Sequence, residues 1–261
     1  DLRDIAPEHN EGVPVVPQII AADADELARL VDVVAVLGYR RIDLNMGCPF
    51  PLQARHGRGS GLMAQCEHAA AIFERMRTYP EVGFSVKLRL GWDDATQIER
   101  LAPLVAAAPL VSVTLHPRLG TVGYKGTADR EAFARFASTC PHPLIYNGDL
   151  LTPTDVKELV TALPTVAGVM MGRGLLARPS LSAELRDGRE WSAAEQIDLL
   201  HRLHDGLHEA YARIVPDDEA LHRKLRPFWD YAETTIGRKA FKKVQKAGNL
   251  RNYLRAVDEI G

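Results

Sequence analysis

The feature that most constrains the fold is a regular alternation of short strand-like runs with longer segments of helical periodicity. Strands are predicted at residues 13–19, 40–45, 84–90, 110–116, 143–147 and 167–172. Helices are predicted between them, at residues 23–38, 62–77, 94–108, 129–137 and 153–163. The strands are nearly continuous apolar runs, which is typical of parallel strands buried on both faces. Repeated βα units of this kind predict a doubly wound sheet or a (β/α)8 barrel.

Polar residues at the strand ends favour the barrel. They stand at or just past the C-terminal ends of successive strands: Gln18, Asn45, Lys87, Arg89, His116, Asn147 and Arg173. In a barrel these ends converge on one mouth, whereas a doubly wound sheet spreads them along a crevice. We therefore predict an α/β fold, a (β/α)8 TIM barrel. Six strands are visible where a barrel has eight, so we expect the first two βα units to be missing ahead of Asp1.

The pattern changes from about residue 179. Four helices are predicted with no strand between them, at residues 192–214, 219–236, 238–247 and 249–260. We therefore predict two domains, an incomplete barrel at residues 1–178 and an all-helical domain at residues 179–261.

Charge is unevenly distributed along the chain. The net charge of −2 does not by itself indicate nucleic-acid binding. Between Arg223 and Arg255, however, ten Lys and Arg residues stand against only Asp230 and Glu233. Such asymmetry indicates contact with a polyanion, and the alternative is a solvated helical face.

The three cysteines, Cys48, Cys66 and Cys140, show no CxxC spacing. An odd number without such spacing argues against a disulfide framework and a zinc site, and for a reducing compartment. No apolar run is long enough to cross a bilayer. We therefore expect a cytoplasmic protein that binds neither membrane nor metal.

Two glycine motifs close the last two strands, NGD at 147–149 and MGRG at 171–174. Loops at these positions of a barrel commonly bind phosphate through backbone N–H groups, and Arg173 would add a bidentate clamp. The alternative is two tight turns and a surface arginine. Lys87 is costly to bury without an anionic partner, either a structural carboxylate or a ring that becomes anionic on reduction. A phosphate site beside a central lysine fits flavin mononucleotide (FMN).

Cys48 lies between Gly47 and Pro49, where a predicted strand runs into a basic, glycine-rich loop that we expect to be mobile. A cysteine thiol is mostly protonated at neutral pH and can donate a proton, so Cys48 is the candidate acid. The alternative is an inert, half-buried cysteine. That alternative is preferred for Cys66, in a predicted helix, and for Cys140, beside Pro141.

The ordered set of motifs resembles the tRNA-dihydrouridine synthases. The set runs through DLNMGCP (43–49), RHGRGSGLM (55–63), SVKLRLGW (85–92), LHPR (115–118) with GY (123–124), NGD and MGRG. The resemblance implies an FMN-binding barrel with a helical RNA-binding domain. It also implies NADPH-dependent reduction of the C5–C6 double bond of specific tRNA uridines.

The resemblance also implies residue roles. Cys48 looks like the acid that protonates C5 while reduced FMN delivers hydride to C6. The implied cofactor contacts are Gln18, Asn45, Lys87, His116, Asn147, Asp149, Gly172 and Arg173. The implied tRNA contacts are Arg55, Arg58, Arg118, Tyr124, Lys239, Lys242 and Lys243. The target base must leave its stack to reach the flavin, and we expect the protein to act as a monomer.

Two other functions are open at this point. One is an FMN barrel that acts on a small pyrimidine, similar to dihydroorotate or dihydropyrimidine dehydrogenases, which would not need a basic helical tail. The other is a non-catalytic tRNA-binding relic, which the presence of Cys48, Lys87 and His116 argues against.

Overall fold

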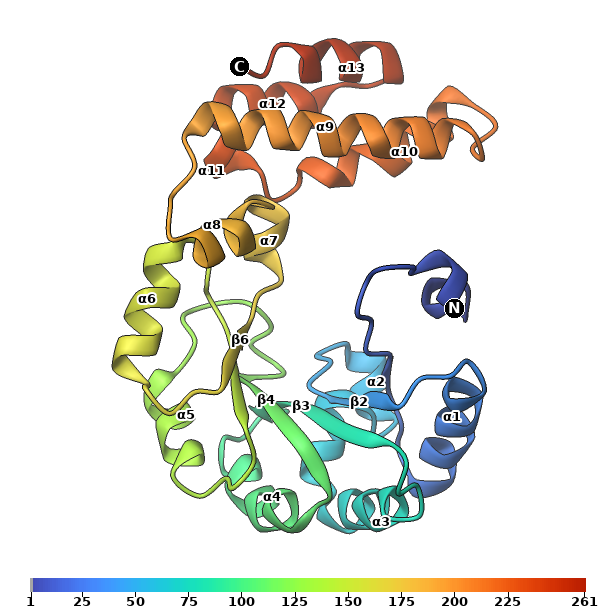
Figure 1. The fold of residues 1–261 in the computed structure, drawn as a ribbon, viewed down its shortest axis with the longest axis vertical. Helices are drawn as coiled ribbons and strands as arrows, with labels where there is room; N and C mark the ends of the chain where they lie inside the picture. Colours follow the sequence, from blue (N-terminus) through green and yellow to red (C-terminus); the bar gives the residue numbers. More distant parts are fainter. Residues whose placement is uncertain (1) are drawn as a thin grey trace. The chain divides into compact units, whose positions relative to one another are not determined.

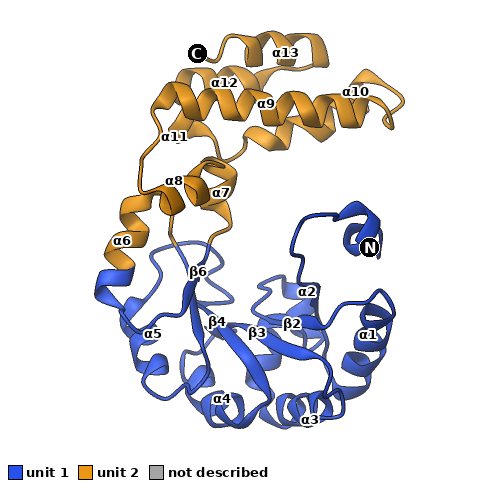
Figure 2. Ribbon diagram, viewed as in Figure 1, with its two compact units in different colours: residues 1–148, 160–170 blue, residues 149–159, 171–261 orange. Residues whose placement is uncertain are grey.

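The computed structural model describes residues 2–261 and divides into two compact units. Unit 1 comprises residues 1–148 and 160–170, and unit 2 comprises residues 149–159 and 171–261 (Figure 2). Helix α6 (Pro153–Ala162) begins in unit 2 and ends in unit 1.

Unit 1 is built on a six-stranded parallel sheet whose spatial order follows the sequence (Figure 1). Its strands are β1 (Gln18–Ile19), β2 (Arg41–Met46), β3 (Gly83–Gly91), β4 (Leu110–Leu119), β5 (Leu144–Asn147) and β6 (Gly168–Met170). A doubly wound sheet reverses its strand order at a switch point, whereas consecutive units of a (β/α)8 barrel keep it. The predicted fold class is therefore confirmed, with an open sheet among the residues that the structure describes.

Helices cover the outer face of this sheet (Figure 1). They are α1 (Ala24–Val36), α3 (Cys66–Met76), α4 (Thr96–Ala107) and α5 (Arg130–Ala137). The side chains of Asp23 and Asp129 cap α1 and α5 by accepting the backbone N–H three residues on. Strand residues such as Leu44 and Val86 are fully buried, as is Leu101 of α4, so the main apolar core of unit 1 lies between strands and helices.

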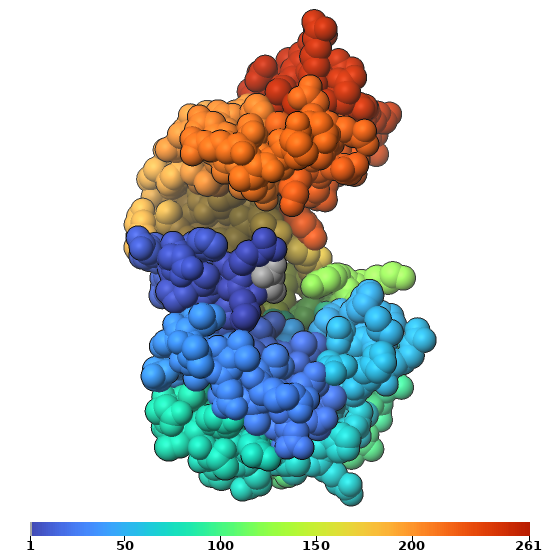
Figure 3. All heavy atoms as spheres, turned by 90° about the vertical axis from the view of Figure 1, so that its right-hand side faces the viewer, coloured from blue at the N-terminus to red at the C-terminus, as the bar shows by residue number. Residues whose placement is uncertain are grey.

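Two segments of unit 1 differ from the sequence-based prediction. The strand expected at 13–19 is reduced to Gln18 and Ile19, because Pro14 and Pro17 have no N–H to donate to a ladder. The loop after Cys48, expected to be mobile, contains α2 (Pro51–Arg55) and the 3-10 helix η3 (Gly59–Ala64), whose residues 59–63 are buried. Before β1, the 3-10 turns η1 (Leu2–Ile5) and η2 (Pro7–His9) form the dark-blue surface in Figure 3.

Unit 2 is helical apart from its connecting segments. Its further elements are α7 (Arg173–Ala177), α8 (Leu181–Asp187), α9 (Ala193–Ala212), α10 (Asp218–Leu225), η4 (Arg226–Trp229), α11 (Glu233–Ile236), α12 (Arg238–Lys246) and α13 (Leu250–Asp258). The helix predicted at 219–236 is broken into α10, η4 and α11 near Pro227. Trp229 and Tyr253 are fully buried at the centre of the unit's core. No helix among residues 2–261 is long and apolar enough to span a membrane.

Candidate active site on the polar face of the sheet

Strand register gathers the predicted site residues of unit 1 on one face of the sheet. Gln18 pairs with Asp43, Asn45 pairs with Lys87, and Arg89 pairs with His116. Partners in register point to the same side of a sheet, so these residues form polar layers opposite the helix-covered face. The sequence-based expectation of apolar strands on both faces therefore holds only for the helix-covered face.

The backbone around Cys48 is held by side chains from two directions. The Asn45 Oδ1 atom accepts the N–H groups of Gly47 at 3.0 Å and Cys48 at 2.8 Å. The Ser60 hydroxyl donates to the Cys48 carbonyl oxygen at 2.7 Å, and the Ser60 N–H donates to the same oxygen at 3.1 Å. A Cβ atom on Gly59, which has φ +57°, would lie 2.7 Å from the Cys48 Cβ atom. The thiol is therefore carried by an ordered, tightly packed turn.

Asp43 is a buried carboxylate that sequence reasoning missed. Its Oδ1 atom accepts from the Ser85 hydroxyl at 2.6 Å, and its Oδ2 atom accepts from Gln18 Nε2 at 2.7 Å. Burial raises the pKa of Asp43 above its ordinary value, against the opposing effect of these two hydrogen bonds and of Lys87. Asp43 lies inside the apolar run RIDLN, where only the strand register shows that it faces the polar side.

Lys87 stands in the middle of the polar face. Burial and the neighbouring Arg89 lower its pKa to about 8, although Asp43 and Cys48 act in the opposite direction. Among residues 2–261, no hydrogen bond or salt bridge of its ammonium group is present. A half-buried cation without such a partner is the arrangement expected of a site that receives an electron-rich or anionic ligand.

Arg89, only 1% exposed, joins two loops of the site. Its Nε atom donates to the Gly47 carbonyl oxygen at 2.9 Å. Its Nη1 atom donates to the carbonyl oxygens of Leu119 at 2.9 Å and Gly123 at 2.8 Å. The guanidinium carbon also lies 5.6 Å from the ring centre of Tyr124. Arg89 therefore fixes the cysteine turn to the loop that follows β4.

His116 and Arg118 are buried together beside that loop. Arg118 Nη1 lies 3.0 Å from His116 Nε2, and Arg118 Nη2 donates to the Gly126 carbonyl oxygen at 2.6 Å. A guanidinium can only donate, so His116 Nε2 accepts this bond and its proton is on Nδ1. His116 is therefore a neutral ring in this structure. Tyr124, at 59% exposed, lies with its ring centre 6.1 Å from that of His116.

The predicted phosphate residues fall at the end of β5 and in unit 2. Asn147 donates from Nδ2 to the Met170 carbonyl oxygen at 2.8 Å, which joins β5 to β6. In unit 2, Arg173 Nη2 lies 3.3 Å from Asp149 Oδ1. Gly172 precedes α7, and both Asp149 and Arg173 line a cavity of about 540 Å3 within that unit.

The predicted tRNA contacts differ in how accessible their charges are. Arg55 is exposed, whereas Arg58 makes a bidentate salt bridge to Glu26, with its shortest N–O distance 2.6 Å. Arg118 is only 4% exposed. On α12 the side chains of Lys239 and Lys242 are exposed, as is that of Lys243, which is paired with Glu259.

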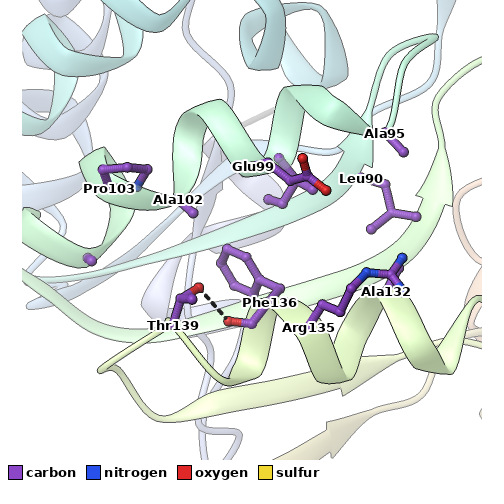
Figure 4. Close-up of a pocket in the computed structure, with 11 residues that line it drawn as sticks. Leu90, Ala95, Glu99, Ala102, Pro103, Ala132, Arg135, Phe136 and Thr139 are labelled. Atoms are coloured by element: carbon purple, nitrogen blue, oxygen red, sulfur yellow. Dashed lines mark hydrogen bonds between the residues drawn. The ribbon is translucent and has the colours of Figure 1, made fainter.

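A separate cavity of about 310 Å3 lies between α4 and α5 on the helix-covered side of unit 1 (Figure 4). Ile98, Ala102 and Phe136 are among its lining residues, and Glu99 and Arg135 supply its charges. It is lined by Leu90 and not by the polar residues of β3, so it is distinct from the candidate active site.

Comparisons with known proteins agree with one another. The dihydrouridine synthase (Dus) family model matches residues 2–259. The tRNA-dihydrouridine(16) synthase of Cupriavidus necator is 31% identical over 228 residues, which are 86% of this chain and 70% of that protein. The probable tRNA-dihydrouridine synthase of Rickettsia prowazekii is 30% identical over 222 residues, or 82% of this chain and 68% of that protein.

Among solved structures, histamine dehydrogenase from Rhizobium sp. 4-9 is similar with a TM-score of 0.51. The match covers 64% of this chain and 27% of that chain at 13% sequence identity. Identity at this level shows a shared fold and carries no conclusion about activity.

Proposed function

The chain belongs to the dihydrouridine synthase family, an enzyme family, and we propose that it reduces the C5–C6 double bond of specific tRNA uridines. In this proposal FMN is the bound cofactor and NADPH is the reductant. The relatives' names support tRNA as the substrate. We also propose that it acts in the cytoplasm as a monomer, with the barrel domain at residues 1–178 and the tRNA-binding domain at residues 179–261.

The observation that carries the proposal is the position of the Lys87 ammonium group on the polar face of the sheet. This half-buried ammonium lies in the layer of Asn45 and Thr114, which flank it in register on β2 and β4. A cation in that position favours a ring that gains negative charge on reduction, and the isoalloxazine of FMN is such a ring. The residues present therefore fit the cofactor.

The proposed cofactor contacts divide by their chemistry. Gln18 and Asn45 would bond polar atoms of the flavin ring, Lys87 would balance its charge, and His116 would contact the ring. The ribityl and phosphate contacts would be made by Asn147, Asp149, Gly172 and Arg173. When bound, reduced FMN supplies the two electrons that saturate the uracil ring.

The chain's own part in the chemistry is to hold and protonate the base. We propose that the Cys48 thiol donates its proton to C5, because the Asn45 and Ser60 bonds fix the turn that carries it. Tyr124 is exposed, and we propose that its ring stacks against an unstacked base. Arg118 supports this site from within, through His116.

The proposed tRNA contacts lie in both units. Arg55 and Arg58 follow the cysteine turn in unit 1, and Lys239, Lys242 and Lys243 lie on α12 in unit 2. Lysine and arginine side chains bind RNA phosphates with release of counterions, so we expect tRNA affinity to fall steeply with salt.

Replacing Lys87 tests the cofactor assignment. Lys87→Gln should weaken FMN binding and make the reduction potential of bound FMN more negative. The shift should be roughly 30 mV for each tenfold loss in the preference of the protein for reduced over oxidised FMN. Lys125→Gln is the matched control, because Lys125 is exposed in the loop after β4. Unchanged affinity and potential in Lys87→Gln would remove Lys87 from the flavin site.

A further inference from the structure

Asp43, Gln18 and Asn45 form a chain of hydrogen bonds that runs in one direction. Gln18 Nε2 donates to Asp43 Oδ2 at 2.7 Å, and Asn45 Nδ2 donates to Gln18 Oε1 at 2.7 Å. At the far end, the N–H groups of Gly47 and Cys48 donate to Asn45 Oδ1. A buried carboxylate is thereby connected through two amides to the backbone of the candidate acid.

Both ends of the chain require the same orientation of the two amides. The Asp43 carboxylate accepts from Gln18, and its other oxygen is occupied by the Ser85 hydroxyl. The two backbone N–H groups can only donate, so Asn45 must turn its oxygen toward them. Reversing either amide would place oxygen against oxygen, or N–H against N–H, at two contacts. The orientation of the two amides is therefore fixed by an acceptor-only carboxylate at one end and by two donor-only N–H groups at the other.

The chain leaves unequal hydrogen-bonding capacity for a ligand. The Asn45 oxygen already accepts two bonds, which use both of its lone pairs, while its NH2 group keeps one spare hydrogen. The NH2 group of Gln18 likewise keeps one spare hydrogen. Gln18 is exposed and Asn45 is half-buried, so both groups are accessible from the polar face.

We propose that Asp43 is a positioning residue that holds this polarity at the Gln18 end of the chain, opposite the backbone N–H groups of Gly47 and Cys48. We also propose that the ligand atom facing Asn45 is a hydrogen-bond acceptor, a ring carbonyl oxygen. The inference rests on the proposed function, because the flavin and the uracil base both carry such carbonyls. It extends that function by naming the chemical group that the site selects and the buried residue that selects it.

The competing role for Asp43 is that of a counter-charge for Lys87, and two substitutions separate the two roles. Asp43→Asn loses the charge but keeps the direction, since its oxygen accepts from Gln18 and its NH2 group donates to the Ser85 hydroxyl. In Asp43→Leu the new side chain is similar in size to that of aspartate, but it has neither the charge nor an atom that accepts from Gln18. Gln18→Leu breaks the chain from the exposed end, because it removes both the donor to Asp43 and the acceptor for Asn45. It serves as well if Asp43→Leu fails to fold.

The first measurement needs neither cofactor nor RNA. In the full chain, the side-chain NH2 resonances of Gln18 and Asn45 and the backbone amides of Gly47 and Cys48 are followed by 15N NMR with hydrogen exchange. We expect protected signals in the wild type and in Asp43→Asn. We expect loss of protection at the three groups that remain in Gln18→Leu, and at all four groups in Asp43→Leu. Equal protection in all four proteins, or equal loss in Asp43→Asn and Asp43→Leu, would overturn the proposal.

The second measurement identifies the carbonyl. FMN affinity is measured by flavin fluorescence without RNA, and the KM for unmodified tRNA is measured separately. If the carbonyl is the flavin's, Gln18→Leu and Asp43→Leu weaken FMN binding about tenfold while Asp43→Asn stays within about threefold. If it is the base's, FMN affinity is retained and the KM for tRNA rises instead. If both the FMN affinity and the KM for tRNA stay at their wild-type values, the ligand assignment is overturned.

The two measurements also separate this inference from the proposed function. If the wild-type chain binds no FMN, the proposed function fails, while the amide resonances still report whether Asp43 orients the chain. If FMN and tRNA are used normally but the amides are unprotected in the wild type, only the positioning role fails.

Discussion

Arg89 Nε donates to the carbonyl oxygen of Gly47 at 2.9 Å, so a buried cation on β3 holds the residue that precedes Cys48. The same guanidinium bonds two carbonyl oxygens of the loop after β4. The position of the proposed acid therefore depends on a residue that need not contact the substrate.

Arg89→Met should destabilise unit 1, because it leaves three backbone carbonyl oxygens without their donor. We expect the free energy of unfolding to fall by about 3 kcal/mol or more, measured by urea denaturation. Arg100→Met removes an exposed arginine and should change it by less than about 0.5 kcal/mol. Similar values for the two variants would show that the carbonyl contacts do not stabilise the fold.

Gly59→Ala tests the packing of the cysteine turn. The new Cβ atom would lie 2.7 Å from the Cys48 Cβ atom and 2.8 Å from its carbonyl oxygen, so the turn must move. Gly123→Ala is the matched control, since Gly123 has a similar φ of +63° but no atom within 4 Å of the added Cβ. We expect dihydrouridine formation to fall about 100-fold more in Gly59→Ala. Equal effects would assign the loss to backbone strain alone.

Cys48→Ala should separate flavin reduction from reduction of the base. Bound FMN should still be reduced by NADPH, while dihydrouridine formation falls by about 100-fold or more, because the proton donor is lost. Cys66→Ala removes a half-buried thiol at the start of α3 and should leave both steps intact. Normal dihydrouridine formation by Cys48→Ala would exclude the thiol as the acid.

Two neighbouring lysines on α12 should contribute unequally to tRNA binding. Lys243 is paired with Glu259, whereas Lys242 is exposed and has no salt-bridge partner among residues 2–261. Lys242→Ala should therefore weaken tRNA binding more than Lys243→Ala and reduce the salt slope by about one unit. Affinity measured over a salt series checks this. If the salt dependence of tRNA affinity in Lys242→Ala and Lys239→Ala equals that of the wild type, these lysines of α12 lie on a solvated face that does not contact tRNA.

The helical core of unit 2 should lose stability in mild acid. Burial lowers the pKa of His204 and His222 below the ordinary value of 6.5. As pH falls through 6.5, the unfolded chain takes up protons that the folded core resists, so the free energy of unfolding decreases. Thermal unfolding from pH 7.5 to 5.5 measures the effect. His204→Gln should flatten the profile, and replacement of the exposed His9 by Gln should not.

The sequence was most informative about site residues that lie near the C-terminal ends of predicted strands. Lys87 and His116 could be placed together because each is a polar residue in the C-terminal half of a predicted strand, and the register places both on the polar face. Asp43 was missed because it lies inside an apolar run. The role of Arg89 was not predictable, because its partners are backbone carbonyl oxygens of residues 42, 30 and 34 positions away.

The loop after Cys48 shows a different limit of sequence reasoning. Glycine and basic residues predicted a mobile segment, yet Gly57 and Gly59 adopt positive φ and allow the chain to fold back under the cysteine. Ser60 then reaches the Cys48 carbonyl oxygen. Composition alone does not distinguish a flexible loop from a tight turn that only glycine can make.

The most direct test of the central claim is NADPH oxidation by the FMN-loaded chain, with and without tRNA that lacks dihydrouridine. We expect oxidation that accelerates with tRNA, matched mole for mole by new dihydrouridine detected by mass spectrometry. Oxidation that is unaffected by tRNA, with no dihydrouridine formed, would contradict it.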